Sequence, residues 1–152
     1  MLHNFAIADI TFEKKFVYFF DERSQGKGAD APYSPRIRCH LRKIREYQRN
    51  NGEPRLCMSL LDNCCGQNKA QVVMQSMGLL SIVFYKVGLM YFLPGLSHML
   101  PDRVVGYCER TIAGYNIYKP SKIVEFCSKI HGVFPEYLQG ISSRGRQPFR
   151  VN

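Results

Sequence analysis

The sequence is short of acidic residues and has no long apolar run, no paired cysteine motif and no internal repeat. Twelve Asp and Glu stand against 21 Lys and Arg in 152 residues, which leaves a formal net charge of +9. No two of the six cysteines are separated by two residues, so the spacing of a zinc finger is absent. The positive excess favours anionic partners, namely nucleic acid, an anionic membrane surface or an acidic protein, or else serves only solubility.

The most apolar stretch, residues 77–93, is interrupted by Ser81, Lys86 and Gly88. A helix that crosses a bilayer needs about 20 apolar residues in succession. We therefore expect a buried helix followed by a buried strand, and no membrane partner. The N-terminus has no charged start followed by an apolar run, so we expect no signal peptide. The cysteines fit reduced thiols in a nuclear or cytosolic protein that is not secreted.

Hydrophobic periodicity predicts an α/β fold, in which a mixed sheet is flanked by helices. Aromatic and β-branched residues at 2–10 and 15–20 predict two strands joined as an antiparallel hairpin. The predicted strands and helices form one domain over residues 1–138. The Ser-, Gly- and Arg-rich residues at 139–152 predict a mobile basic tail. After the hairpin we expect a helix from Ser34-Pro35 to about residue 49, a buried strand at 56–61, a helix from about Asn68, a strand at 87–93, and helices at 101–113 and 120–131.

Asp62 directly follows the strand predicted at 56–61, in a loop rich in hydrogen-bonding side chains. Ligands of α/β sheets collect beyond the carboxyl ends of the strands. Asp62 is therefore a candidate metal ligand or general base, although Asp is also a preferred cap and could simply start the next helix. Asn63, Gln67 and Asn68 add polar groups that can support such a site.

A second acid, Asp102, follows the strand predicted at 87–93, and His98 lies four residues before it. Carboxylates at neighbouring strand ends suit Mg²⁺ or Mn²⁺, because these ions prefer hard oxygen ligands. His98 either orients a water or contacts phosphate, or it is a structural histidine. Glu109 lies two helical turns beyond Asp102 on the same face, where we expect it to give surface or structural support.

The helix predicted from Pro35 carries six basic residues and a single acid, Glu46. These side chains can neutralise phosphates with salt-dependent affinity, or they form an ordinary solvated helix face. No zinc finger, homeodomain or basic zipper pattern is present, so nothing indicates readout of a base sequence. The six are Arg36, Arg38, Arg42, Lys43, Arg45 and Arg49.

Four segments resemble, in order and spacing, the hallmarks of transposon-derived domains with an RNase H-like fold. Residues 61–69, LDNCCGQNK, resemble the SDNCGGQNKN motif of that family. Residues 92–103, FLPGLSHMLPDR, resemble its PGHSH segment and the acid that follows. Residues 5–9 and 20–30 resemble two of its upstream motifs, and the similarity covers about residues 3–130.

The resemblance implies chemistry of the DDE transposase or integrase type, with three acids, two divalent metal ions and a phosphodiester substrate. Asp62 matches the second acid and Asp102 matches the third. The first acid normally lies on the first strand, whereas this chain begins at the second, and Asp9 and Asp21 lie on the wrong strands to replace it. Leu96 also stands where the family usually has His. The resemblance thus implies a remnant or fragment of a metal-dependent phosphodiester-processing domain, catalytically incomplete and lacking the first strand of its sheet.

Two alternatives stay open. The first is a non-catalytic domain for nucleic-acid binding or protein interaction that uses the basic helix at 36–49. The second is a metal-free enzyme that uses Cys64 or Cys65 with His98, although nothing indicates a lowered thiol pKa. DNA or RNA is the expected partner of the transposase-like domain and of the nucleic-acid-binding domain.

Overall fold

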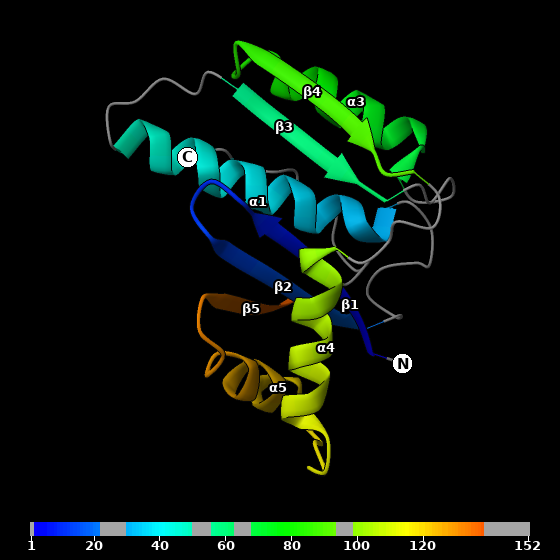
Figure 1. Ribbon diagram of the computed structural model, residues 1–152, viewed down its shortest axis with the longest axis vertical. Coiled ribbons are helices and arrows are strands. Elements are labelled where there is room, and N and C mark those ends of the chain that lie inside the picture. Colours follow the sequence, from blue (N-terminus) through cyan, green and yellow to red (C-terminus); the bar gives the residue numbers. More distant parts are fainter. Residues whose placement is uncertain (1, 22–29, 50–55, 63–67, 94–98, 139–152) are drawn as a thin grey trace, which may run out of the picture.

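The computed structural model describes residues 2–21, 30–49, 56–62, 68–93 and 99–138. The fold is mixed α/β, as predicted (Figure 1). The strands are β1 (Leu2–Asp9), β2 (Lys14–Asp21), β3 (Leu56–Leu61), β4 (Lys86–Tyr91) and β5 (Val133–Leu138). The helices are α1 (Asp30–Arg49), α3 (Gln71–Leu80), α4 (Leu100–Ile112) and α5 (Pro120–Cys127).

Three strands form a mixed sheet in the order β1-β2-β5. The predicted hairpin is confirmed, because β1 and β2 are antiparallel from Leu2 opposite Asp21 to Asp9 opposite Lys14. The Asp9 carboxylate accepts hydrogen bonds from the backbone N–H groups of Thr11 and Phe12, at 3.1 and 3.3 Å. Asp side chains commonly fix turns in this way. Strand β5 then runs parallel to β2 on its other side.

The centre of β2 is buried on both faces, since helices cover each side of this sheet. Five consecutive residues, 16–20, are at most 6% exposed. Val17 and Phe19 pack with residues of α4 and α5, namely Val104, Cys108, Ile123 and Cys127. Phe16, Tyr18 and Phe20 pack on the other face against Cys39 of α1 and Leu138 of β5. Most of the buried apolar side chains in the described residues belong to these two clusters.

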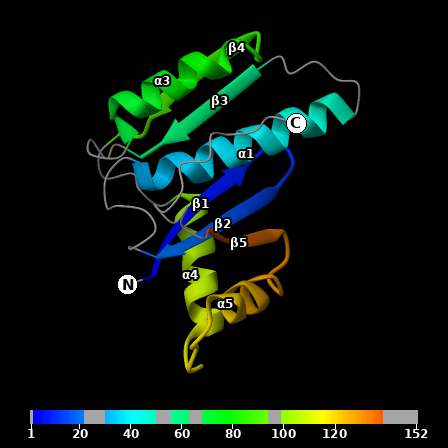
Figure 2. The ribbon, with the colours of Figure 1, turned by 180° about the vertical axis from the view of Figure 1, so that it is seen from behind.

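The second sheet has two parallel strands, β3 and β4, joined through α3. Helix α1 runs across the molecule between the two sheets (Figures 1 and 2). Together with α3 it covers one face of the pair, where Met77, Leu80 and Phe84 pack with Ile44, Tyr47, Cys57, Val87 and Leu89. Within the described residues β1 pairs only with β2 and β3 only with β4, so the strands form two sheets and not one.

The prediction that the strand at 56–61 is buried is wrong. Its burial alternates, and Leu56, Met58 and Leu60 are 57%, 53% and 42% exposed. Met90 of β4 is 53% exposed as well. The reason is that the helices of the described chain pack on only one face of this pair.

Several predicted boundaries also move. Helix α1 begins at Asp30, so Pro35 lies inside the helix and is fully buried, and it does not occupy the first position. Helix α3 begins at Gln71 rather than at about Asn68, and α5 ends at Cys127 rather than at 131. Helix α4 ends near Gly114, whose φ of +87° favours glycine.

Residues 77–93 include the end of α3, a turn and β4, so the predicted helix and strand are confirmed, but β4 ends at Tyr91 and is not buried, since Lys86 and Met90 are exposed. No helix in the described ranges is long and apolar enough to cross a bilayer. Strand β5 was not predicted, because its Pro135 is unfavourable inside a sheet; an edge strand tolerates it. The predicted basic tail at 139–152 lies outside the described residues.

Candidate functional site

The side chain of Asp62 is held in place at the carboxyl end of β3. Asp62 is exposed, whereas Asn68 is only 6% exposed. The Asn68 Nδ2 donates hydrogen bonds to Asp62 Oδ1 and, at 3.3 Å, to the Asp62 carbonyl oxygen. The Asn68 Oδ1 accepts a hydrogen bond from the guanidinium of Arg36. Because Arg36 can only donate, the amide of Asn68 must direct its nitrogen at Asp62.

Three elements therefore meet at Asn68. Arg36 comes from α1 and is 5% exposed, and its guanidinium carbon lies 5.4 Å from the centroid of the Phe5 ring of β1. Burial lowers the pKa of Arg36, and the negative charge of Asp62 partly offsets this effect. Tyr91 of β4 donates its hydroxyl to the Asn68 carbonyl oxygen at 3.0 Å. These contacts fix the position of Asn68 and, through it, of the Asp62 carboxylate.

Arg36 was predicted among the nucleic-acid-binding residues of the basic helix. It is instead buried and bonded to Asn68, so it belongs to this site and not to a nucleic-acid-binding surface. The signal for its position is its spacing from His40 and Ile44, four and eight residues later, which places all three on one side of α1. Ile44 packs in the cluster beneath β3 and β4. Tyr91, the last residue of β4, also belongs to this site and was not predicted from the sequence.

Asp62 does not cap α3, because Ala70 is the cap residue there and makes no side-chain capping hydrogen bond. Asp102 has a clearer structural role. It lies in the first turn of α4, where its Oδ2 accepts the backbone N–H of Met99 at 3.1 Å. An acid in this position stabilises the N-terminal end of a helix. Glu109 is exposed farther along the same helix.

The carboxyl end of β3 and the N-terminal ends of α1 and α4 lie toward the same side of the molecule (Figures 1 and 2). Asp62 directly follows β3 and Asp102 lies in the first turn of α4, and both are exposed. Their oxygen atoms suit Mg²⁺ or Mn²⁺. Within the part of the chain that the structure describes, no group of three or more His, Cys, Asp or Glu could hold a metal ion. His98, Asn63, Gln67, Cys64 and Cys65 lie outside that part.

The other basic residues of α1 divide into two groups. Arg38 and Arg42 both pair with Glu136 of β5, the latter at 3.2 Å. Lys43 pairs with Asp9 and, at 3.5 Å, with Glu46. These three cations therefore link α1 to strands β5 and β1 of the three-stranded sheet, and Lys43 also pairs with Glu46 of α1 itself. Arg45 and Arg49, by contrast, are exposed near the end of the helix.

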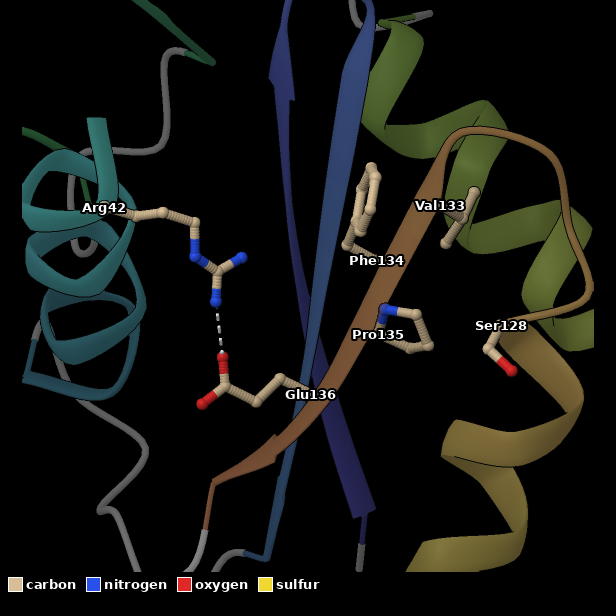
Figure 3. Close-up of a pocket in the computed structure, with 6 residues that line it drawn as sticks. All are labelled: Arg42, Ser128, Val133, Phe134, Pro135 and Glu136. Carbon is tan, nitrogen blue, oxygen red and sulfur yellow. Dashed lines mark hydrogen bonds and ion pairs between the residues drawn. The ribbon is translucent and has the colours of Figure 1, made fainter. Parts of the chain in front are cut away.

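A shallow hollow of about 560 Å³ lies beside β5 and is open to solvent (Figure 3). Figure 3 shows Arg42 reaching from α1 to Glu136, whereas Val133 and Ser128 lie on the other side of the strand. Among the described residues of the lining, Glu136 carries the only carboxylate, and it is already paired with Arg38 and Arg42. We therefore interpret the hollow as a gap beside the edge strand β5, because its described lining contains no unpaired carboxylate. Its lining residues are Arg42, Ser128, Val133, Phe134, Pro135 and Glu136.

Cysteine chemistry gains no support from the described thiols. Burial raises the pKa of Cys39 to about 11, and burial also raises the pKa of Cys57. Cys108 and Cys127 are fully buried between α4 and α5. The hydrogen bond between these two thiols lowers the pKa of Cys108 and raises that of Cys127. Both side chains are shielded from solvent, and buried structural cysteines are unreactive.

Comparisons of the chain with family models, with curated proteins and with solved structures found no match.

Proposed function

We propose that this chain is part of an RNase H-like, transposase- or integrase-type phosphodiester-processing domain. In this proposal Asp62 and Asp102 bind a divalent cation, Mg²⁺ or Mn²⁺, and the chain alone does not catalyse hydrolysis. The element order supports it: an antiparallel hairpin, a long helix, and two parallel strands joined through a helix. The free edges of β1 and β3 in the described residues also fit a sheet from which one strand is missing.

The observation that carries the proposal is the buried support behind an exposed carboxylate. A surface aspartate needs no such support. Here the buried Asn68 donates to the Asp62 carboxylate, and the buried Arg36 donates in turn to Asn68. Burying an arginine is costly unless it is well paired. A carboxylate fixed before its ligand arrives binds a cation with less loss of side-chain entropy.

Charge explains why we propose binding without hydrolysis. Two-metal phosphoryl transfer holds two divalent ions about 4 Å apart and needs several acids around them. Asp62 and Asp102 supply two carboxylates, and Asp102 already accepts a backbone hydrogen bond. Asp9, the acid at the end of β1, is paired with Lys43 and fixes the hairpin turn. When bound, the cation would polarise a phosphate oxygen; the role of Asp62 and Asp102 is to hold it.

Mn²⁺ titration followed by NMR tests the cation site, because this paramagnetic ion broadens nearby resonances. We expect broadening of the Asn68 side-chain amide and of the Met99 backbone amide in the unmodified protein. Asp62→Asn should abolish the effect at Asn68. Glu125→Gln, which alters an exposed acid of α5 paired with Lys122, is the matched control and should change nothing at either amide.

Uniform broadening, or equal broadening in Asp62→Asn, would show that no site exists at Asp62. Plasmid nicking is the second readout. Mn²⁺-dependent nicking by the purified chain that is lost in Asp62→Asn would overturn the proposal that the chain alone is inactive, while supporting its cation site.

A nucleic-acid-binding domain without catalysis is the second candidate. The net charge of +9 favours it, as do the exposed side chains of Arg45 and Arg49. Since Arg38 and Arg42 are paired with Glu136, they are weaker candidates for phosphate contact. Salt-sensitive DNA binding that falls in Arg45→Glu plus Arg49→Glu and survives Asp62→Asn would favour this candidate. Binding that is insensitive to salt would count against it.

A further inference from the structure

Helix α4 carries a row of exposed cationic and aromatic side chains that the proposed cation site does not use. Arg103, Tyr107 and Arg110 are exposed and follow one another at intervals of four and three residues. This spacing places them along one flank of the helix, over about 10 Å. The guanidinium carbon of Arg110 lies 4.9 Å from the centroid of the Tyr107 ring. We call these three residues the α4 row.

The charges of α4 are segregated around its buried side, which Val104 and Cys108 define. At 100° per residue, the α4 row lies on one flank of that side, whereas Asp102 and Glu109 lie on the other. Asp102 also accepts a hydrogen bond from the backbone of its own helix end. The α4 row therefore presents positive charge on a flank that carries none of the acids of its own helix.

Exposed aromatic rings continue past the C-terminal end of α4. Tyr115 and Tyr118, in the segment that leads to α5, are 60% and 89% exposed. Tyr115 stacks on Phe126 with ring centroids 4.6 Å apart and an interplanar angle of 28°. The Nζ of Lys129 lies 5.0 Å from the centroid of the Phe126 ring. Lys129 thus lies beside the stacked pair of Tyr115 and the half-buried Phe126. The Tyr118 ring, which is 89% exposed, contributes little to the core.

We infer that the α4 row, continued by Tyr115 and Tyr118, binds single-stranded nucleic acid. Proteins bind single strands by combining cations that neutralise phosphates with aromatic rings on which unpaired bases stack. A duplex keeps its bases stacked inside and offers these rings little. The inference deepens the proposed function by naming the form of its substrate, and it rests on that function for the choice of ligand. It requires neither Asp62 nor a cation.

Fluorescence anisotropy with a labelled oligothymidylate tests the inference, with EDTA present so that no divalent cation contributes. Tyr107→Leu should raise the Kd at least about fivefold, because one stacked base is lost. Arg103→Gln plus Arg110→Gln should reduce the slope of log Kd against log salt by roughly 1.4, about 0.7 for each phosphate contact. Tyr85→Leu is the matched control, since Tyr85 is 84% exposed beside Lys86 but far from α4 in sequence, and its Kd should not change.

An unchanged Kd in Tyr107→Leu, with circular dichroism matching the unmodified protein, would overturn the inference. So would equal affinity for a duplex of the same length, or a loss of self-association in Tyr107→Leu without any oligonucleotide binding. Failure of this inference can be distinguished from failure of the proposed cation site. Asp62→Asn should leave the Kd in EDTA unchanged, and the Mn²⁺ broadening at Asn68 should persist in Tyr107→Leu.

Discussion

The two sheets of this protein differ in how completely they are covered. In the three-stranded sheet, the five central residues of β2 are at most 6% exposed, because α1 covers one face and α4 and α5 cover the other. In the two-stranded sheet, the described elements cover only the face toward α1 and α3. Leu56, Met58 and Leu60 face solvent at 42–57% exposure. Parallel strands are normally covered on both faces, so the second sheet is the unusual one.

The residues that stabilise the fold and the candidate site therefore lie in different sheets. Apolar burial is the main stabilising term, and it is concentrated around β2. Asp62, by contrast, follows a strand of the two-stranded sheet, where Asn68 and Arg36 form a buried polar network behind it. Functional groups often lie in regions that contribute least to global stability. Variants in the two sheets should therefore differ in both the size and the kind of their effects.

The largest expected effect is a cavity in the three-stranded sheet. Phe19 is 4% exposed and packs among residues of α4 and α5. Phe19→Ala should lower the free energy of unfolding by about 3–5 kcal/mol, through lost burial and the space left behind. Urea unfolding followed by circular dichroism measures the change. A loss below about 1 kcal/mol would show that the core does not lie where the structure places it.

The next effect concerns pH and the helix between the sheets. Burial, helped by the positive charge of Arg36, lowers the pKa of His40 from 6.5 to about 4. The His40 Nδ1 lies 3.9 Å from Cys57 Sγ of β3. As the pH falls below 6.5, the unfolded chain takes up this proton first. Stability should therefore fall between about pH 6.5 and 4, by up to roughly 3 kcal/mol, and His40 should not affect it above that range.

Unfolding free energies of the unmodified protein and His40→Asn across that range isolate this contribution, because the carboxylates titrate alike in both. The slope of stability against pH should be smaller in His40→Asn. Equal slopes would mean that His40 is accessible to protons in the folded state.

A smaller loss is expected in the network beneath the candidate site. Asn68→Ala removes the acceptor of Arg36 and leaves a buried guanidinium without that bond. A hydrogen bond to a charged group contributes about 1.5–3 kcal/mol, so we expect a loss of about 2 kcal/mol. Gln75→Ala, at an exposed amide of α3, is the control and should change stability by less than about 0.5 kcal/mol. A loss in Asn68→Ala no larger than in this control would mean that the network stabilises nothing.

The sequence predicted both strands of the second sheet but not its exposed face, and it predicted two of the three strands of the first sheet. Strands β1 and β2 were predicted because their composition and the short polar turn at Thr11 act locally. The apolar run of β3 indicates a strand, but it does not indicate which face a helix will cover. Strand β5 escaped prediction because Pro135 is compatible only with an edge, and an edge is a property of the whole sheet.

The candidate site was predictable in the same uneven way. Asp62 and Asn68 belong to one short motif, and the structure shows them bonded to each other. Arg36 lies 32 residues before Asn68, and no spacing rule connects them. Its charge placed it with the surface cations, although its position on the side of α1 that carries Ile44 pointed inward. Pairing between distant elements is the step that sequence patterns alone did not supply.

The smallest effect is expected on the open face of the two-stranded sheet. Leu60 is 42% exposed, and its outward side chain would lose little buried area in Leu60→Ser. We expect a change of at most about 0.5 kcal/mol, against about 3–5 kcal/mol for Phe19→Ala, measured by the same urea unfolding. Cys57, the residue that β3 turns toward α1 and α3, provides the internal contrast. Cys57→Ser should cost more than Leu60→Ser, because it puts a hydroxyl among apolar side chains. If Leu60→Ser instead costs 2 kcal/mol or more, roughly what a buried leucine contributes, then the face is covered in solution and the contrast between the sheets disappears.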